Sequence, residues 1–311
     1  MTVKLGYLIP TRENVMRGDH AASTLINRAK LAADLGFDSL WIGDSLTARP
    51  RHDPLTLLAG IATAVPGPQL GTAVLLPALR NPVVLAQQLA TIDQLSEGRL
   101  IVGAGIAADA PAIRAEFAAA SVPFEGRVGR LLEGFRLCRA LWTGEPVDWD
   151  GRWQLQQQSL APTPYQPGGP PVWLAAGIDV AIQRAAKHFD GWMPIGPDVA
   201  TFAQRQALFT DTAQVHQRGA LTTALYLTIC IDSDANAADQ AVNDYLEPYY
   251  GVPAAAMRGI QACFGGQIDD VLAFIRSYVQ AGAQHLIIRI VGDHEQTLTQ
   301  LSKHRQHLDD H

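Results

Sequence analysis

Residues 69–106, QLGTAVLLPALRNPVVLAQQLATIDQLSEGRLIVGAGI, contain one strand–helix–strand unit. The run 70–75 consists mainly of small and β-branched apolar residues, which suit a strand buried on both faces. Asn81-Pro82 predicts a helix start, with asparagine as the N-cap and proline at the first helical position. Gly98 predicts the helix end, and 100–102 begins a second buried strand. A crossover of this length predicts that the two strands are parallel.

The same alternation of strand and helix continues along the chain. Further strands are expected near residues 3–9, 39–42, 171–175, 191–193, 221–231 and 285–290. Together with the opening pair they make eight strands, which favours a (β/α)8 TIM barrel over an open doubly wound sheet. A chain of 311 residues is about right for one such barrel.

The interval between the fourth and fifth strands is about twice the usual length. We therefore predict a single domain over 1–311, with an insertion at about 106–170 on the upper rim of the barrel. The insertion is expected to hold a short helix capped by Asp109, a longer helix, and a hairpin that turns at Asp150-Gly151.

Composition excludes several functional classes. A net charge of -6 and a pI near 5.8 argue against a nucleic-acid or anionic-membrane surface. Cys138, Cys230 and Cys263 lie far apart, which indicates neither a disulfide framework nor a metal site. No run approaches the ~18 apolar residues of a membrane span, and the amino terminus leads straight into a strand. These features predict a cytoplasmic protein.

Several motifs occur in the order in which one enzyme family carries them. They are WIGDS at 41–45, the stretch at 71–105, FEGR at 124–127, LWTGEPVDWDGRWQL at 141–155 and PPVWLAAG at 170–177. In these motifs the chain resembles the luciferase-like monooxygenase superfamily. It is most similar to the branch that uses the deazaflavin coenzyme F420, in which an acidic residue follows the second strand. The FMN-using branch is close behind.

The resemblance places a flavin or deazaflavin ring in the barrel mouth, against a bulge with a non-proline cis peptide bond. Position by position, that bond falls between Ala73 and Val74. Asp44 lies at the carboxyl end of the second strand, where parallel α/β proteins bind ligands. The resemblance implies that it contacts the cofactor; the alternative is a turn residue that caps the following loop.

Small residues after two other strands are candidates for the cofactor's phosphate tail. They are Gly103, Gly105, Ala176 and Gly177. Glycines there could admit an anion close to backbone N–H groups, but they are also common turn residues in barrels. Asp179 follows Gly177 and would repel an anion, so capping of the next helix is the alternative there.

The residue after Asp44 separates this chain from one part of the family. Relatives that oxidise a sugar phosphate with the deazaflavin typically carry histidine there, whereas this chain has Ser45, a poor general base without a partner. Ser45 is expected to orient substrate or water.

Two further residues are candidates for substrate contacts. Arg289 could bind an anionic substrate; the alternative is a salt bridge to Asp293 or Glu295. His52 is a candidate proton relay, or a surface residue.

The first functional hypothesis is an oxidoreductase that transfers hydride between F420 and a small organic substrate other than a sugar phosphate. An FMN-dependent two-component monooxygenase is the second, and a catalytically silent flavin-binding relative is the third. The resemblance also implies a homodimer and, as a partner, a separate flavin or F420 reductase. The loops around 45–53, 106–123 and 250–268 are expected to choose the substrate.

Overall fold

Eight parallel strands form the core of the computed structural model, which describes residues 2–308. They are β1 Lys4–Leu8, β2 Ser39–Ile42, β3 Gln69–Thr72, β4 Leu100–Ala104, β7 Val172–Leu174, β8 Gly191–Trp192, β9 Thr222–Ile231 and β11 His285–Val291. Their order in the sheet is β9-β11-β1-β2-β3-β4-β7-β8, and β8 pairs back onto β9. The sheet is therefore closed, and the predicted (β/α)8 barrel is confirmed.

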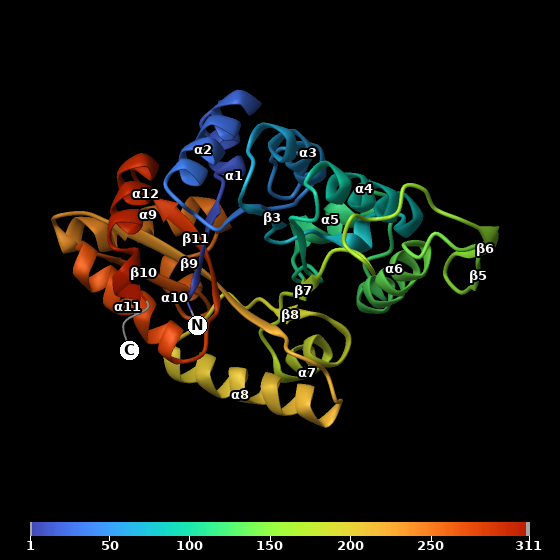
Figure 1. Cartoon of the computed structure of the whole chain (residues 1–311). Coiled ribbons are helices and arrows are strands. Elements are labelled where there is room, and N and C mark those ends of the chain that lie inside the picture. The colour runs from blue at the N-terminus through green and yellow to red at the C-terminus, as the bar shows by residue number, and fades with distance from the viewer. Residues whose placement is uncertain (1, 309–311) are drawn as a thin grey trace. The chain divides into compact units, whose positions relative to one another are not determined.

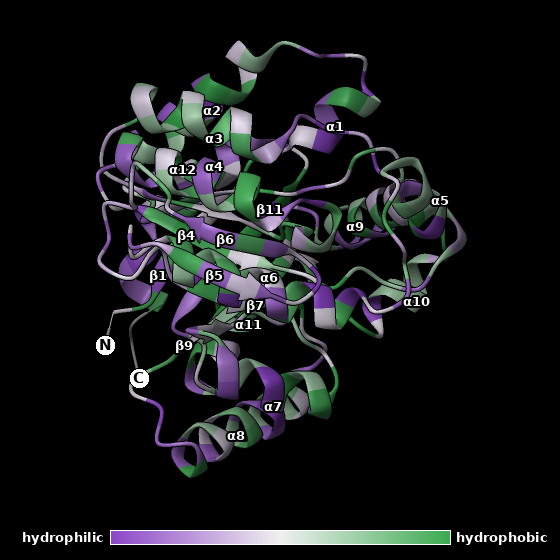
Figure 2. Ribbon diagram, turned by 90° about the vertical axis from the view of Figure 1, so that its right-hand side faces the viewer, coloured by the Kyte–Doolittle hydropathy of each residue, from purple (hydrophilic) through white to green (hydrophobic). Residues whose placement is uncertain are grey.

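Helices follow most of these strands. They are α1 Thr11–Met16, α2 Ala22–Asp34, α3 Pro54–Ala64, α4 Pro82–Leu95, α5 Pro111–Ala119, α6 Arg127–Leu141, α7 Asp179–His188, α8 Val199–Val215, α9 Ala235–Tyr250, α10 Ala254–Arg258, α11 Ile268–Gln280 and α12 His294–Lys303, with 3-10 turns at η1 Pro77–Leu79 and η2 Arg305–Leu308. Figure 2 shows apolar residues along β4 and a mixture of polar and apolar residues on α7 and α8. Within residues 2–308, no helix combines the length and the apolar character needed to cross a membrane.

Local capping explains where two of the helices begin. The side chain of Asn81 accepts a hydrogen bond from the Val83 amide at 2.9 Å, and Asp53 accepts one from the Thr56 amide at 2.8 Å. In both cases a proline follows at the first helical position, where no N–H is needed. The start of α4 agrees with the prediction from Asn81-Pro82.

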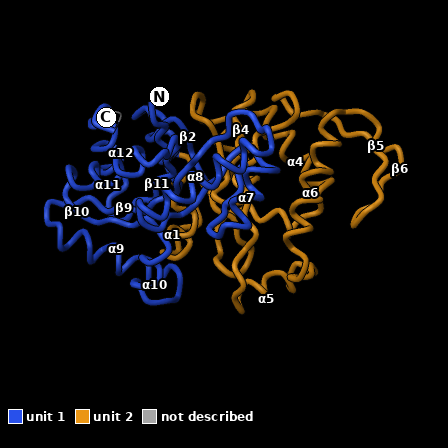
Figure 3. The backbone as a smooth tube through the Cα atoms, turned by 90° about the horizontal axis from the view of Figure 1, so that it is seen from below, with its two compact units in different colours: residues 1–9, 27–41, 173–311 blue, residues 10–26, 42–172 orange. Residues whose placement is uncertain are grey.

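The chain divides into two compact units (Figure 3). One comprises the chain before Pro10, Asn27–Trp41, and the chain from Trp173 onward. In this unit the helices α9, α11 and α12 lie beside β9, β10 and β11 (Figure 1). The other unit comprises Pro10–Ile26 and Ile42–Val172. A single domain over the whole chain stays a prediction.

The insertion after β4 contains α5, α6 and a hairpin of β5 Val147–Asp150 and β6 Gln154–Gln158, as expected. The predicted cap of α5 is wrong. Ala110 is the N-cap, and the carboxylate of Asp109 instead binds Arg114, with Arg114 Nε 2.7 Å from Asp109 Oδ1. Pro111 sets the helix start two residues after Asp109, so this carboxylate lies beyond the capping position.

Asp179 also differs from the capping alternative. It is the first residue of α7, and the N-cap is Ile178, whose side chain makes no capping hydrogen bond. An acidic side chain in the first turn is favourable beside the positive end of the helix dipole.

The strand β10, Ala262–Gly266, was not predicted. It pairs parallel to the carboxyl-terminal half of β9, from Ala262 opposite Leu227 to Gly266 opposite Ile231. The segment ACFGG has no strand periodicity, and two glycines weaken its intrinsic preference. It becomes a strand because β9 extends beyond its pairing with β8, and the backbone groups of this extension need partners.

Aromatic side chains fill the interior beside β2, β7 and β11. The ring of His285 lies 5.5 Å from that of Trp41 and 5.1 Å from that of Trp173. His285 Nε2 and Trp41 Nε1 each lie 2.7 Å from the hydroxyl oxygen of Ser39. A Cβ on Gly6 would approach that same oxygen to 2.5 Å, so only glycine fits there. These two tryptophans are core residues.

Candidate active site

A backbone shelf lies where β3 and β4 end. We define this shelf as residues 73–76 and 103–105. The Leu75 amide donates to the Gly103 carbonyl at 2.7 Å, and the Gly105 amide donates to the Leu75 carbonyl at 2.8 Å. The Ala73–Val74 peptide bond is cis, which confirms the prediction from the resemblance.

Gly105 has a packing role within the shelf. A Cβ built on it would lie 2.5 Å from Val74 Cγ2, closer than real side chains approach. The Val74 side chain therefore occupies the space that a larger residue at 105 would need. This contact accounts for the glycine whether or not a phosphate lies nearby.

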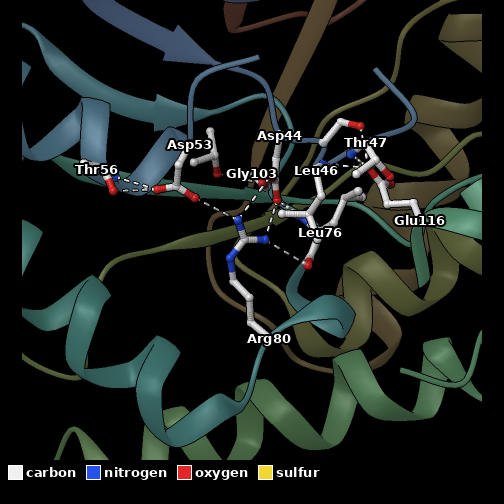
Figure 4. A network of polar contacts seen from close by, with 11 residues as sticks. Asp44, Leu46, Thr47, Asp53, Thr56, Leu76, Arg80, Gly103 and Glu116 are labelled. Atoms are coloured by element: carbon white, nitrogen blue, oxygen red, sulfur yellow. Dashed lines mark hydrogen bonds and ion pairs between the residues drawn. The ribbon is translucent and has the colours of Figure 1, made fainter. Parts of the chain in front are cut away.

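Asp44 is tied to the shelf by its carboxylate (Figure 4). Its Oδ2 atom accepts hydrogen bonds from the Leu76 amide at 2.9 Å and from Arg80 Nη1 at 2.5 Å, and Oδ1 lies 3.1 Å from Arg80 Nη2. Only 1% of this side chain is exposed. Both carboxylate oxygens have donors within the protein, so Asp44 does more than cap a loop. It fixes the end of the shelf and orients a cation.

Arg80 was not recognised from the sequence as a site residue. It follows η1 and pairs with Asp44, while Asp53 approaches Arg80 Nη2 at 3.4 Å (Figure 4). Burial acts to lower the pKa of Arg80, but the interactions with the two carboxylates raise it above its usual value. In the sequence, Arg80 is a single arginine between an apolar stretch and the N-cap Asn81. Nothing in the neighbouring residues indicates that it pairs with Asp44.

Ser45 meets a buried carboxylate from the insertion. The Ser45 hydroxyl donates to Glu116 Oε1 at 2.6 Å, and its oxygen accepts a hydrogen bond from the Arg49 amide at 2.9 Å. The amides of Leu46, Thr47 and Ala48 donate to the same Glu116 oxygen at 2.5, 2.9 and 3.1 Å. Burial acts to raise the pKa of Glu116, but these hydrogen bonds hold it below its ordinary value. The carboxylate therefore stays ionised at neutral pH.

Arg127 supports the segment that follows β4. Its Nε donates to the carbonyls of Ile106 and Ala107 at 3.2 and 3.3 Å, and its guanidinium lies 3.8 Å from the ring centroid of Phe124. A guanidinium can bind a phosphate through its terminal nitrogens while Nε is used elsewhere. The FEGR motif contributed to the family resemblance, but its position in the fold could not be read from the sequence.

His52 lies on the loop before α3, where its Nε2 is 3.1 Å from the carbonyl oxygen of His20. Within residues 2–308, no group of three or more histidine, cysteine, aspartate or glutamate side chains could hold a metal ion, and His52 belongs to no such group.

Three predicted site residues belong to the other unit. Ala176 is buried and its carbonyl accepts a hydrogen bond from Trp192 Nε1 at 2.8 Å. Gly177 faces open space, because a Cβ there would meet no atom within 4 Å.

Arg289 is 4% exposed, and its guanidinium carbon lies between 4.4 and 5.5 Å from the ring centroids of four tyrosines, Tyr226, Tyr245, Tyr249 and Tyr250. Asp293, one expected salt-bridge partner, caps α12.

The family model for luciferase-like monooxygenases matches residues 3–311. The chain belongs to the luciferase-like monooxygenase family. This membership agrees with the barrel and with the cis bond at the end of β3. It makes the protein an oxidoreductase of this family.

Relatives of this luciferase-like protein are named for two cofactors. An F420-dependent glucose-6-phosphate dehydrogenase from Amycolatopsis mediterranei is 28% identical over 90% of this chain and 92% of its own. The structure of an F420-dependent secondary alcohol dehydrogenase with an F420–acetone adduct has a TM-score of 0.85 at 16% identity, with both chains fully covered. A Baeyer-Villiger monooxygenase from Pseudomonas putida with bound FMN has a TM-score of 0.77 at 17% identity, covering 97% and 98%. F420 is thus the first cofactor to consider and FMN the second.

Proposed function

We propose that this protein transfers hydride between F420 and a small organic substrate other than a sugar phosphate. The observation that carries the proposal is the shelf, which Asp44 and Arg80 hold at the carboxyl ends of β3 and β4. The carboxyl ends of the strands are where barrel enzymes bind ligands. When bound, the deazaflavin ring accepts or donates hydride at C5.

The shelf and its surroundings fit such a cofactor. Val74 supplies an apolar surface for the ring, and Asp44 with Arg80 supplies a charged pair for the ring edge or tail hydroxyls. Gly103, Gly105, Ala176 and Gly177 are the proposed contacts of the tail. Arg127 adds a cation for its phosphate.

Ser45 is proposed to orient substrate or water rather than to remove a proton. Its hydroxyl hydrogen is engaged with Glu116, and one lone pair accepts from Arg49. The second lone pair remains for a substrate donor. The pKa of Glu116 lies below its ordinary value, so this carboxylate is too weak a base to activate Ser45, and Ser45 does not replace the histidine that the resemblance implies for sugar-phosphate dehydrogenases.

Arg289 and His52 are the proposed substrate contacts. A buried guanidinium near the end of β11 suits an anionic or hydrogen-bond-accepting group. Comparing Arg289→Met with the wild type on acidic and neutral substrates tests this, because loss of a charge contact would raise KM for the acidic substrates only.

Cofactor titration tests the proposed function. Purified protein is titrated with F420 and, separately, with FMN, and fluorescence quenching reports binding. Saturable quenching of F420 is expected. Tight binding of FMN with none of F420 would favour the two-component monooxygenase, and binding of neither would reject the proposal.

Substitution of two glycines separates shelf packing from ligand contact. Gly105→Ala forces a methyl group against Val74, so we expect F420 affinity to fall about tenfold, as one well-placed contact is lost. In Gly177→Ala the methyl group enters open space, so the free protein keeps its Tm. Weaker F420 binding by this second variant would place the cofactor beside Gly177, and unchanged binding would remove Gly177 from the site.

Homodimer formation is also proposed, with a separate reductase as partner in the FMN case and the cytoplasm as location. Val84 and Leu95 are 53% and 42% exposed, and an interval of 11 residues places them on one face of α4. We expect light scattering to report twice the 33.5 kDa mass of one chain. A single 33.5 kDa species at micromolar concentration would contradict the dimer.

A further inference from the structure

One buried carboxylate oxygen organises the loop that follows β2. The amides of Leu46 and Thr47 donate to Glu116 Oε1 (Figure 4). The amide of Ala48 and the hydroxyl of Ser45 donate to the same oxygen. Successive N–H groups that converge in this way form a concave anion site, here filled by a side chain from residue 116. Without this acceptor, the three part-buried amides would lose their hydrogen bonds within the protein.

Glu116 is itself held in place by packing. The residue is fully buried on α5, where its neighbours Ile113 and Phe117 belong to one apolar cluster with Leu76 and Leu79. Leu76 is also the shelf residue whose amide binds Asp44. The insertion helix, the loop 45–48 and the end of the shelf therefore meet at one apolar cluster, against which Ala48 packs.

The hydrogen bonds that the Glu116 carboxylate accepts from residues 2–308 all come from residues 45–48. Its second oxygen, Oε2, is buried and has no hydrogen-bond partner among residues 2–308. Burial of a charged group with an unused acceptor is unfavourable unless other interactions offset it. The four donors from residues 45–48 supply that compensation.

We infer that Glu116 is a positioning residue, which holds Ser45 and the loop 45–48 in the conformation that cofactor and substrate binding require. This inference rests on the proposed function. Glu116 acts through the loop that directly follows Asp44, and no contact of Glu116 with the ligand is needed. Glu116 therefore links the insertion to the loop that follows β2.

Hydrogen exchange on the free protein tests the anchor. We expect the amides of 46–48 to exchange about 100-fold faster in Glu116→Ala and about tenfold faster in Glu116→Gln, because a neutral oxygen accepts more weakly than a carboxylate. Glu125→Gln is the matched control: it makes the same chemical change in the same insertion, but the Glu125 side chain is 77% exposed and pairs with Arg114. Its exchange at 46–48 should equal that of the wild type.

Cofactor affinity tests the positioning role. The F420 dissociation constant is expected to rise at least about tenfold in Glu116→Ala and about threefold in Glu116→Gln, and to stay unchanged in Glu125→Gln. Unchanged exchange at 46–48 in both Glu116 variants would overturn the anchor. Faster exchange with wild-type affinity would show that Glu116 is merely structural. If Glu116→Ala does not fold, the isosteric glutamine variant decides both points.

The proposed function can fail separately from this inference. Wild-type protein that binds neither F420 nor FMN would reject that function and with it the positioning role. The exchange measurement would still decide whether Glu116 anchors the loop.

Discussion

Replacing Asp44 with alanine is expected to lower the free energy of unfolding by about 3–5 kcal/mol and to weaken F420 binding at least tenfold. The variant removes a carboxylate that is 1% exposed and leaves the Arg80 guanidinium, itself only 14% exposed, without its closest ion-pair partner. It also leaves the Leu76 amide without its acceptor. Urea unfolding and F420 titration measure the two effects.

Two comparisons of variants test whether the lost stability comes from the broken ion pair between Asp44 and Arg80. Asp44→Asn and Asp53→Asn make the same chemical change at the two carboxylates that approach Arg80, but Asp53 is 46% exposed and lies at 3.4 Å, so its variant should lose less than about 1 kcal/mol. Combining Asp44→Ala with Arg80→Ala should recover part of the lost stability, because no unpaired buried charge remains. A double variant less stable than Asp44→Ala would contradict this account, and unchanged F420 affinity in Asp44→Ala would remove Asp44 from the cofactor site.

His285 should make the protein less stable as the pH falls below about 6.5. Burial, with a smaller contribution from the charge of Lys4, lowers the pKa of His285 to about 3 in the folded protein. The unfolded chain binds a proton near pH 6.5, so between these values the unfolded state holds more protons and stability rises with pH. One such group lowers stability by about 3 kcal/mol between pH 6.5 and pH 4.

The measurement is the pH dependence of the free energy of unfolding from urea titrations. His285→Gln should be less stable at neutral pH, because it disturbs the packing around Trp41, but its stability should fall less steeply with decreasing pH. His216→Gln is the control, since that histidine is exposed at the end of α8. If the free energy of unfolding falls equally steeply with pH in the wild type and in His285→Gln, the buried His285 ring does not resist protonation.

Much of the fold could be predicted because its signals are local. Asn81-Pro82 and Asp53-Pro54 mark helix starts through groups one to three residues apart, and hydrophobic runs mark strands. Helix caps depend on backbone groups that lie next to each other in the chain, so the residues themselves report them. The family motifs also predicted the cis bond at Ala73–Val74, which local signals do not report. By contrast, ACFGG became a strand only because β9 offered an unpaired edge.

The sequence by itself determined the eight-stranded barrel and the position of Asp44 at a strand end. The tertiary structure decided what these residues touch: Arg80 pairs with Asp44 across 36 residues of chain, and Glu116 reaches Ser45 across 71. Such pairs have no local signature, because a buried charge is stabilised by whichever partner the fold brings to it. Against the effect of burial, hydrogen bonds from residues 45–48 lower the pKa of Glu116, whereas burial lowers the pKa of His285; neither shift can be read from a stretch of sequence.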